Sequence, residues 1–286
     1  MRRFYQIGRF RFAALCQEDL HIPPHFALFE TDEKDISYTY HIQIVRDLPA
    51  LNGRQIYQSS KLHVYEHEGL EERLIMMDGG NTAYAVYREI NEGRAEILLA
   101  EAQVQEVLKY DTTFTSLFSL EKKMTDHDSL ILHSASVCRD GKAVLFSAPS
   151  GTGKSTQAEL WRKYRGVRII NGDRNLLVKD KGGWQMRGWP VCGSSEICHN
   201  EAYPAAAIVM LEQAAYDRSS ELTGMAAYRK LFPEVTVSRW NKERLIYNMD
   251  LIEQLIQEVP VFRLECRIGE SAVEVLERQL LKSGCL

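Results

Sequence analysis

The residues of this 286-residue chain best suited to chemistry form a glycine-rich turn, Gly-Thr-Gly-Lys-Ser-Thr, at residues 151–156. An apolar run at residues 143–148 precedes the turn, and a helical pattern follows it. Because glycine has no Cβ, backbone N–H groups can converge on an anion at such a turn, and the next helix adds its unpaired amides and positive dipole end. The pattern predicts a loop that binds the phosphate groups of a nucleotide.

Each residue of the turn has an expected role in that chemistry. Lys154 is expected to reach the β- and γ-phosphates, and the Ser155 hydroxyl to hold Mg²⁺. The spacing is that of G-x-x-x-x-G-K-[ST], except that Ala148 replaces the first glycine, which an alanine can do if its φ is negative. The alternative is an ordinary strand-to-helix turn with a solvated lysine, which the helix dipole disfavours. The residues expected to contact the nucleotide are Ser150, Gly151, Thr152, Gly153, Lys154, Ser155 and Thr156.

Two further side chains are expected beside the loop. Asp173 ends the run RIINGD after an apolar strand, where a carboxylate can hold Mg²⁺ directly or through water. His133 lies on the strand that hairpins back into the strand before the loop, and it can deprotonate an acceptor hydroxyl or bind the metal. A lone histidine on an apolar strand is more often structural. Strand ends meet at one edge of an open α/β sheet, so we expect these groups to converge.

The elements that must position these residues are predicted by the hydrophobic pattern. Short alternating or aromatic runs separated by turns fill the first hundred residues and predict a mostly antiparallel β region. From residue 101 to about 123 the apolar spacing becomes helical, typical of one or two helices. We therefore predict two domains, a smaller β-rich domain with a helical linker at residues 1–124 and a larger domain at residues 125–286.

The second domain alternates strand and helix patterns, with a hairpin signal at residues 180–183. The predicted strands span residues 129–138, 143–148, 167–170, 175–179, 184–187, 205–212 and 261–266. The predicted helices follow the loop to about residue 164 and then span residues 226–231, 242–258 and 271–281. This alternation predicts an α/β fold with hairpins among the helices.

Composition narrows the classes of partner. The chain is 45% apolar with a net charge of −4, so it can bury a core and has no overall field that favours nucleic acid. Its longest apolar run, at residues 205–211, is too short to span a bilayer. Arg9 and Arg11 interrupt the apolar core that a signal peptide needs. We expect a cytoplasmic protein without a nucleic-acid or membrane partner.

The cysteines and paired histidines have a structural explanation. Six cysteines without framework spacing predict reduced, buried thiols. Cys192, Cys198 and His199 match no common zinc spacing. His63 and His67 lie on an alternating stretch that predicts a strand, where they are expected to be solvent-exposed.

With these residues in view, the chain resembles the HPr kinase/phosphorylase and ATP-dependent phosphoenolpyruvate carboxykinase superfamily over residues 129–212. The resemblance is carried by a histidine strand, a turn and the phosphate loop in LHSASVCRDGKAVLFSAPSGTGKST, and by NGDR at residues 171–174. It implies a P-loop core of mixed sheet with helices. The block MRGWPVCGSSEICHNEAYP resembles the segment bordering the acceptor site, so Arg187 and Glu196, with Arg174, become candidates for phosphate, metal or acceptor contact, or else are surface residues.

The chain departs from the family at Gly172, where the family has the first of two acids. That first acid resembles the general base for the attacking hydroxyl, and the second resembles a metal ligand. Asp173 therefore keeps the expected metal role, and the base must come from His133 or from Asp173 acting twice.

The resemblance implies an ATP- and Mg²⁺-dependent kinase that transfers the γ-phosphoryl group to a hydroxyl of a peptide, protein or small molecule, with His133, Lys154 and Asp173 as catalytic residues. The alternative is a nucleotide-binding switch or scaffold with little or no phosphotransfer, which Gly172 and Ala148 favour. Carboxykinase activity does not fit a chain of this length. The acceptor, the nucleotide base, the use of pyrophosphate and the oligomeric state are left open.

Overall fold

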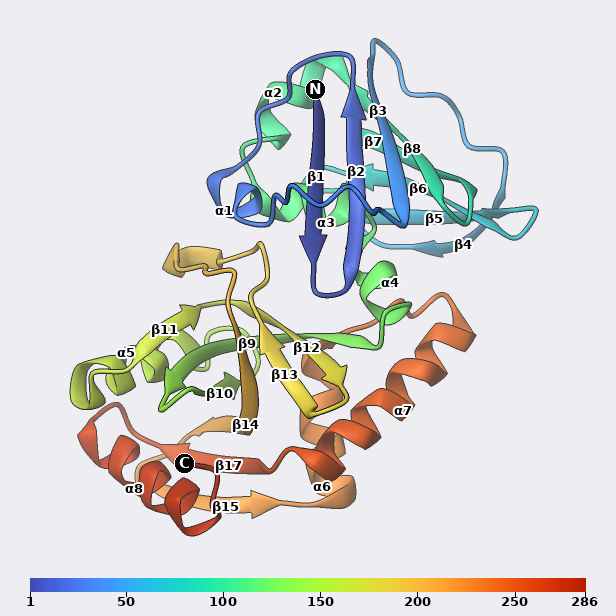
Figure 1. The fold of residues 1–286 in the computed structure, drawn as a ribbon. Helices are drawn as coiled ribbons and strands as arrows, with labels where there is room; N and C mark the ends of the chain where they lie inside the picture. Colours follow the sequence, from blue (N-terminus) through green and yellow to red (C-terminus); the bar gives the residue numbers. More distant parts are fainter. The chain divides into compact units, whose positions relative to one another are not determined.

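The computed structural model describes all 286 residues, and the chain forms two compact units (Figure 1). Unit 1 comprises residues 1–123 with 239–241, and unit 2 comprises residues 124–238 with 242–286. The sequence analysis placed residues 239–241 in the C-terminal domain, whereas the structure has them in unit 1. The reason is Trp240, whose ring packs 4.8 Å from the Tyr57 ring and whose indole N–H donates to Glu71 at 3.1 Å.

Unit 1 is built on an eight-stranded sheet in the order β1-β2-β3-β8-β7-β6-β5-β4. Its strands are β1 (Arg2–Ile7), β2 (Phe10–Cys16), β3 (Tyr38–Val45), β4 (Arg54–Gln58), β5 (Leu62–His67), β6 (Leu70–Met76), β7 (Ala83–Asn91) and β8 (Arg94–Ala100). Only the β2–β3 and β3–β8 pairings are parallel. The mostly antiparallel β region predicted from the sequence is therefore confirmed.

Short helices complete this half of the chain: α1 (Pro24–Ala27), α2 (Glu101–Val107), α3 (Asp111–Leu117) and α4 (Leu120–Thr125). The one or two helices expected over residues 101–123 are three, because Ser119 adopts a φ of +51° directly before α4 and Leu108–Tyr110 separate α2 from α3. Buried aromatic rings fill the core, and the Tyr40 hydroxyl donates to the Phe118 carbonyl at 2.6 Å.

Unit 2 contains a nine-stranded mixed sheet whose main order is β10-β9-β12-β13-β14-β17-β15. Its strands are β9 (Ser129–Arg139), β10 (Lys142–Ser147), β11 (Arg168–Asn171), β12 (Arg174–Asp180), β13 (Gly183–Arg187), β14 (Ala202–Gln213), β15 (Arg218–Leu222), β16 (Val235–Thr236) and β17 (Val261–Cys266). β9 pairs with β12 along its first half and with β10 and β11 along its second half. The sheet thus divides near the middle of β9, where His133 lies.

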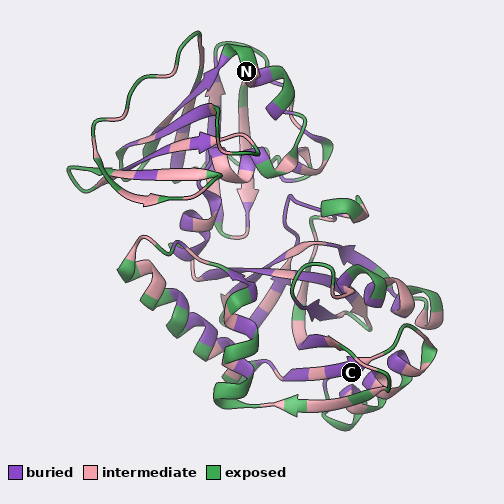
Figure 2. Ribbon diagram, turned by 180° about the vertical axis from the view of Figure 1, so that it is seen from behind, coloured by how far each residue is buried: buried purple, intermediate pink, exposed green.

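Helices cover both faces of this sheet (Figures 1 and 2). They are α5 (Lys154–Arg165), α6 (Gly224–Leu231), α7 (Lys242–Glu258) and α8 (Glu270–Lys282), with 3-10 turns η1 (Gly193–Ser195) and η2 (Phe232–Glu234). Leu145 of β10 joins the core under α6 and α7, while its neighbours Val144 and Phe146 join the core under α5 and α8. Alternate side chains of a strand point to opposite faces, so the α/β class predicted from the sequence is confirmed.

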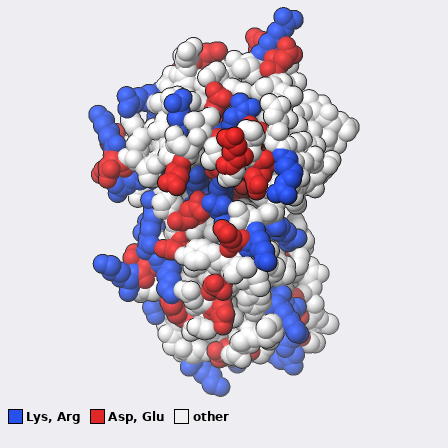
Figure 3. Space-filling model, turned by 90° about the vertical axis from the view of Figure 1, so that its right-hand side faces the viewer, with Lys and Arg blue, Asp and Glu red and all other residues white.

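Neither the surface nor the helices suggest an extended partner of one kind. Figure 3 shows Lys and Arg side chains interspersed with Asp and Glu over the face in view, without a broad patch of one sign. The longest helix, α7, has 17 residues, and no helix of the chain is both long and apolar enough to cross a bilayer.

Candidate functional site

The glycine-rich turn joins β10 to α5 through two glycines with positive φ. Gly151 has φ +80° and Gly153 has φ +115°, a region that other residues rarely adopt. No atom lies within 4 Å of a Cβ built on either residue, so the backbone conformation rather than crowding requires glycine. Ala148 is buried and lies outside the positive-φ region. The condition under which alanine replaces the first glycine is therefore met.

The start of α5 offers unpaired hydrogen-bond donors. No side chain caps the helix, and the first amide of its opening turn that bonds within the chain is that of Gln157, which donates to the Gly153 carbonyl at 2.9 Å. The earlier amides of the helix are therefore available to a ligand at the positive end of the dipole. The loop is open to solvent, because Ser150, Gly151, Ser155 and Thr156 are exposed and Thr152 and Gly153 are half-buried.

Lys154 is a buried cation without a carboxylate partner. Its side chain bends back over the loop, and Nζ donates to the carbonyls of Ala148 at 2.9 Å and Pro149 at 3.4 Å. Burial lowers the pKa of Lys154, while the negative charges of Glu234 and Asp173 oppose that shift. A buried charge is costly unless it is compensated, so this ammonium favours an anion at the mouth of the loop.

His133 lies between two carboxylates. Its Nδ1 is 3.0 Å from Glu234 Oε2, and its Nε2 is 3.8 Å from Asp173 Oδ1. The Ser147 hydroxyl donates to the His133 carbonyl at 2.8 Å, which ties the histidine to the end of β10. Burial, followed by the charge of Lys154, lowers the pKa of His133, against a hydrogen bond from Glu234 that raises it. The imidazole is therefore neutral at pH 7, and with Nδ1–H donated to Glu234 its Nε2 can accept a proton.

Asp173 is presented by a rigid turn between β11 and β12. The buried Asn171 accepts the N–H groups of Asp173 at 2.8 Å and Arg174 at 3.1 Å through Oδ1. Its Nδ2 donates to the carbonyls of Trp189 at 2.9 Å and Val191 at 3.0 Å. The Arg174 guanidinium then donates to Asp173 Oδ2 at 2.6 Å. A fully satisfied buried amide thus holds the carboxylate in place.

The turn also shows what stands in place of the missing acid. Ser155 Oγ donates to the Gly172 carbonyl at 3.1 Å, which links the loop to the turn. A Cβ on Gly172 would lie 2.0 Å from Ser195 Oγ, so Ser195 fills the space that a side chain at 172 would need. Ser195 Oγ donates to the Cys192 carbonyl at 2.7 Å and accepts the Ile197 N–H at 3.2 Å. A side chain at position 172 is incompatible with this arrangement.

The structure brings together most of the residues that the sequence nominated. His133, Lys154, Ser155 and Asp173 meet where β9, the loop and the β11–β12 turn converge. Arg174 pairs with His133 across the strands. Arg187 lies on the same sheet face, opposite Leu176, and its Nε is buried without a hydrogen bond. Glu196 differs, since it is exposed with φ +54° and makes no bond to this group.

Glu234 is the member of this group that sequence reasoning missed. It ends η2 and is only 9% exposed, although a carboxylate is seldom that buried unless it is paired. The strand β16 that follows pairs with β9 through Val235 and Leu132, and this pairing brings Glu234 to His133. The only signal in the sequence is an acid directly before Val235, and a two-residue strand leaves no recognisable pattern.

The cysteines form no disulfide bond, in line with the thiols predicted. Cys198 Sγ donates to the Trp189 carbonyl at 3.1 Å, whereas His199 Nδ1 lies 3.2 Å from the Arg168 guanidinium. These two residues therefore have separate partners rather than a shared one.

The fold and this cluster define an α/β protein in which a glycine-rich strand–turn–helix lies beside a histidine held by carboxylates. A protein-family model described as SynChlorMet cassette protein ScmC matches residues 96–282, more than half of the chain, and the chain belongs to this ScmC family. Among solved structures the chain is similar to the Hpr(Ser) kinase/phosphatase from Coxiella burnetii, with a TM-score of 0.33 and 11% identity over 54% of this chain and 92% of that one. No curated protein matches it.

Proposed function

We propose that this chain is an ATP- and Mg²⁺-dependent phosphotransferase with a P-loop core related to HPr kinase, which moves the γ-phosphoryl group of ATP to a hydroxyl. The observation that supports it most is Lys154, a buried ammonium at an uncapped helix start, with no carboxylate partner and with a neutral histidine nearby. Such an arrangement suits a polyanion next to a proton acceptor.

The loop would bind the triphosphate through its backbone amides and Lys154, whose charge neutralises the phosphates as the transferred group moves. Ser155 and Asp173 would hold Mg²⁺, since both meet at Gly172 and both supply the oxygen atoms this ion prefers. When bound, the metal supplies charge neutralisation on the phosphate oxygens.

Proton transfer would fall to His133. In the proposed reaction its Nε2 takes the proton of the acceptor hydroxyl, an O–P bond forms to the γ-phosphorus, and the bond to the leaving ADP breaks. Glu234 accepts the Nδ1–H, holds the ring and stabilises the imidazolium that results. Arg174 keeps the Asp173 carboxylate turned into the site. The acid absent at Gly172 is thus replaced by a histidine from the neighbouring strand.

The proposed partners are a nucleotide and a hydroxyl-bearing acceptor, a serine of a peptide or protein or a small molecule. Arg187, with its buried Nε unpaired, is a candidate for an anionic group of that acceptor. We also propose a cytoplasmic location, because ATP is abundant there and thiols stay reduced.

The test is transfer of label from γ-labelled ATP with Mg²⁺ to hydroxyl acceptors. Lys154→Ala is expected to abolish both transfer and ATP binding measured by calorimetry. Lys163→Ala is the matched control, because Lys163 is an exposed lysine on the same helix. Unchanged ATP binding in Lys154→Ala would contradict the proposal.

A second function, a nucleotide-binding switch or scaffold, is favoured by one observation: Ser195 occupies the space in which a side chain at 172 would stand. Tight Mg²⁺-dependent ATP binding, without label transfer to any acceptor and without hydrolysis, would identify the switch. Transfer that depends on His133 would exclude it.

A further inference from the structure

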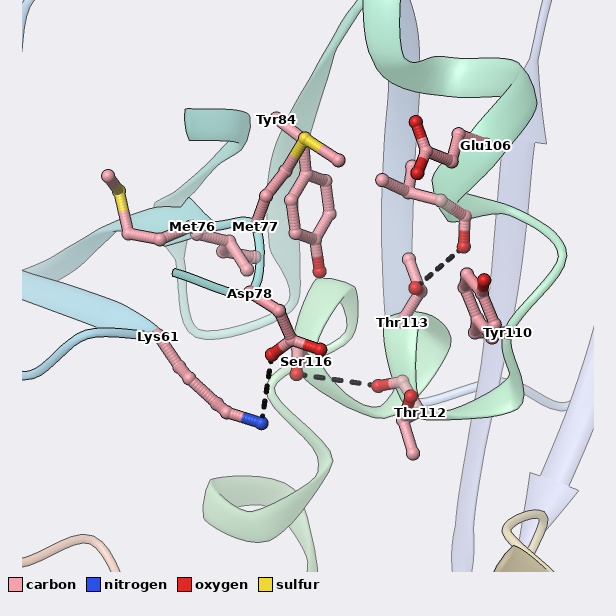
Figure 4. Close-up of a pocket in the computed structure, with 12 residues that line it drawn as sticks. Lys61, Met76, Met77, Asp78, Tyr84, Glu106, Tyr110, Thr112, Thr113 and Ser116 are labelled. Carbon is pink, nitrogen blue, oxygen red and sulfur yellow. Dashed lines mark hydrogen bonds and ion pairs between the residues drawn. The ribbon is translucent and has the colours of Figure 1, made fainter. Parts of the chain in front are cut away.

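Unit 1 contains a cavity of about 360 Å³ that lies outside the phosphate-binding cluster (Figure 4). It opens between the end of β6 and the segment that joins α2 to α3. The volume lies at the lower end of the range of small-ligand pockets, roughly 300–1,000 Å³. All residues that line it belong to unit 1, so its ligand need not involve the glycine-rich loop.

The floor of the pocket is apolar. Ile75, Val107 and the Tyr84 ring are each at most 7% exposed and form it. The thioether side chains of Met76 and Met77 lie along one side, where their flexibility lets them fit ligands of different shape (Figure 4). This part of the cavity suits an aliphatic stem rather than a fully polar ligand.

Acidic and aromatic groups surround that floor. Asp78 and Glu106 supply two carboxylates, and Tyr110 presents a ring that is 59% exposed (Figure 4). No lining residue forms an ion pair with Glu106. Burial raises the pKa of Tyr84 to about 12, so its phenol stays protonated and neutral. Carboxylates and aromatic faces together attract an organic cation.

One lining residue opposes this preference, and it does so weakly. Lys61 Nζ lies 3.1 Å from Asp78 Oδ1, but the two side chains are 76% and 90% exposed. An ion pair this exposed contributes little and can open for a competing cation. The lining therefore carries two carboxylates against one loosely held ammonium.

We propose that this pocket binds the side chain of an arginine or lysine that a peptide presents, with the aliphatic stem on the apolar floor and the cationic head at Glu106 and Asp78. A long basic side chain has this division into an apolar stem and a charged head. The open side of the cavity leaves room for the flanking peptide backbone. This inference does not depend on phosphotransfer.

The experiment uses the full chain with [¹³C-methyl]methionine and three blocked peptides, acetyl-Leu-Arg-Leu-amide, its citrulline isostere and acetyl-Leu-Glu-Leu-amide, without nucleotide. The arginine peptide is expected to shift the Met76 and Met77 methyl resonances, and the neutral and acidic peptides are not. Met225 and Met249 of unit 2 are internal controls. Equal shifts from the citrulline peptide, shifts confined to Met225 and Met249, or no shifts would overturn the proposal.

Two variants with opposite expected signs sharpen the test. Lys61→Ala frees Asp78 and is expected to tighten binding of the arginine peptide by about two- to fivefold, whereas Glu106→Gln is expected to weaken it by a similar factor. Glu101→Gln is the matched control, because Glu101 is exposed on the same helix outside the pocket. If Lys61→Ala instead weakened arginine binding and strengthened nothing, the pocket would not select cations.

Discussion

At the scale of single residues, the pair of His133 and Glu234 has the most direct chemical consequence. The pKa of His133 lies below its usual 6.5, chiefly because of burial. A base must be unprotonated to act, so phosphotransfer is expected to be level at neutral pH and to fall only as the pH drops through that lowered pKa. A pH profile of label transfer checks this, and a decline that begins above pH 7 would contradict it.

Glu234 gives the same site a second prediction, with a sign of its own. Its hydrogen bond raises the pKa of His133, so Glu234→Gln is expected to move the acid limb of the profile to lower pH and to reduce turnover. The loss should be smaller than that of His133→Ala, which removes a base worth roughly 10²–10⁴-fold. Glu253→Gln, an exposed acid on α7, is the control. An unmoved acid limb would show that Glu234 does not tune the histidine.

At the scale of elements, the strand–turn–helix unit depends on backbone conformation. Gly153→Ala is expected to lower the free energy of unfolding by about 1–2 kcal/mol, because φ there is +115°, and to weaken ATP binding. Gly182→Ala is the control, since Gly182 has neither a positive φ nor a close neighbour. Urea unfolding and calorimetry measure the two effects. Equal stability of both variants would mean that the turn relaxes without cost.

The elements also show how far the pattern of residues predicts structure. Helix α7 and strand β17 have the predicted bounds, because periodic apolar residues mark them clearly. β15 has the polar sequence RSSEL at a sheet edge, and β16 has two residues, so neither carries a recognisable period. The loop and the nominated acids were predictable from types and spacing. Glu234 and Ser195 were not, because only tertiary pairing brings them to the site.

At the scale of the whole molecule, Trp240 joins unit 1 from far along the chain. Burial would raise the pKa of Glu71, but Arg73 and Lys122, helped by the Trp240 hydrogen bond, lower it to about 2. A carboxyl with a depressed pKa stabilises the fold above its unfolded pKa near 4.5, and that stability is lost as the pH falls towards 2. Unit 1 is therefore expected to resist mild acid.

Trp240→Ala tests this link between distant parts of the sequence. The variant is expected to lower the free energy of unfolding of unit 1 by about 1–3 kcal/mol and to shift its acid transition to higher pH. Trp240→Phe separates the two contributions, because it keeps a ring against Tyr57 and removes the N–H donor to Glu71. Urea unfolding at several pH values is the measurement. Identical acid transitions in all three proteins would exclude a role for the hydrogen bond.

The packing of Ser195 against Gly172 bears on how this site could change over evolutionary time. An aspartate introduced at 172 alone would collide with the serine before it could contribute any chemistry. A lineage regaining that acid must alter both positions, and whichever change comes first brings no benefit on its own. Relatives carrying an acid at 172 should therefore differ at 195 as well, as a covarying pair whose intermediate forms selection would rarely retain.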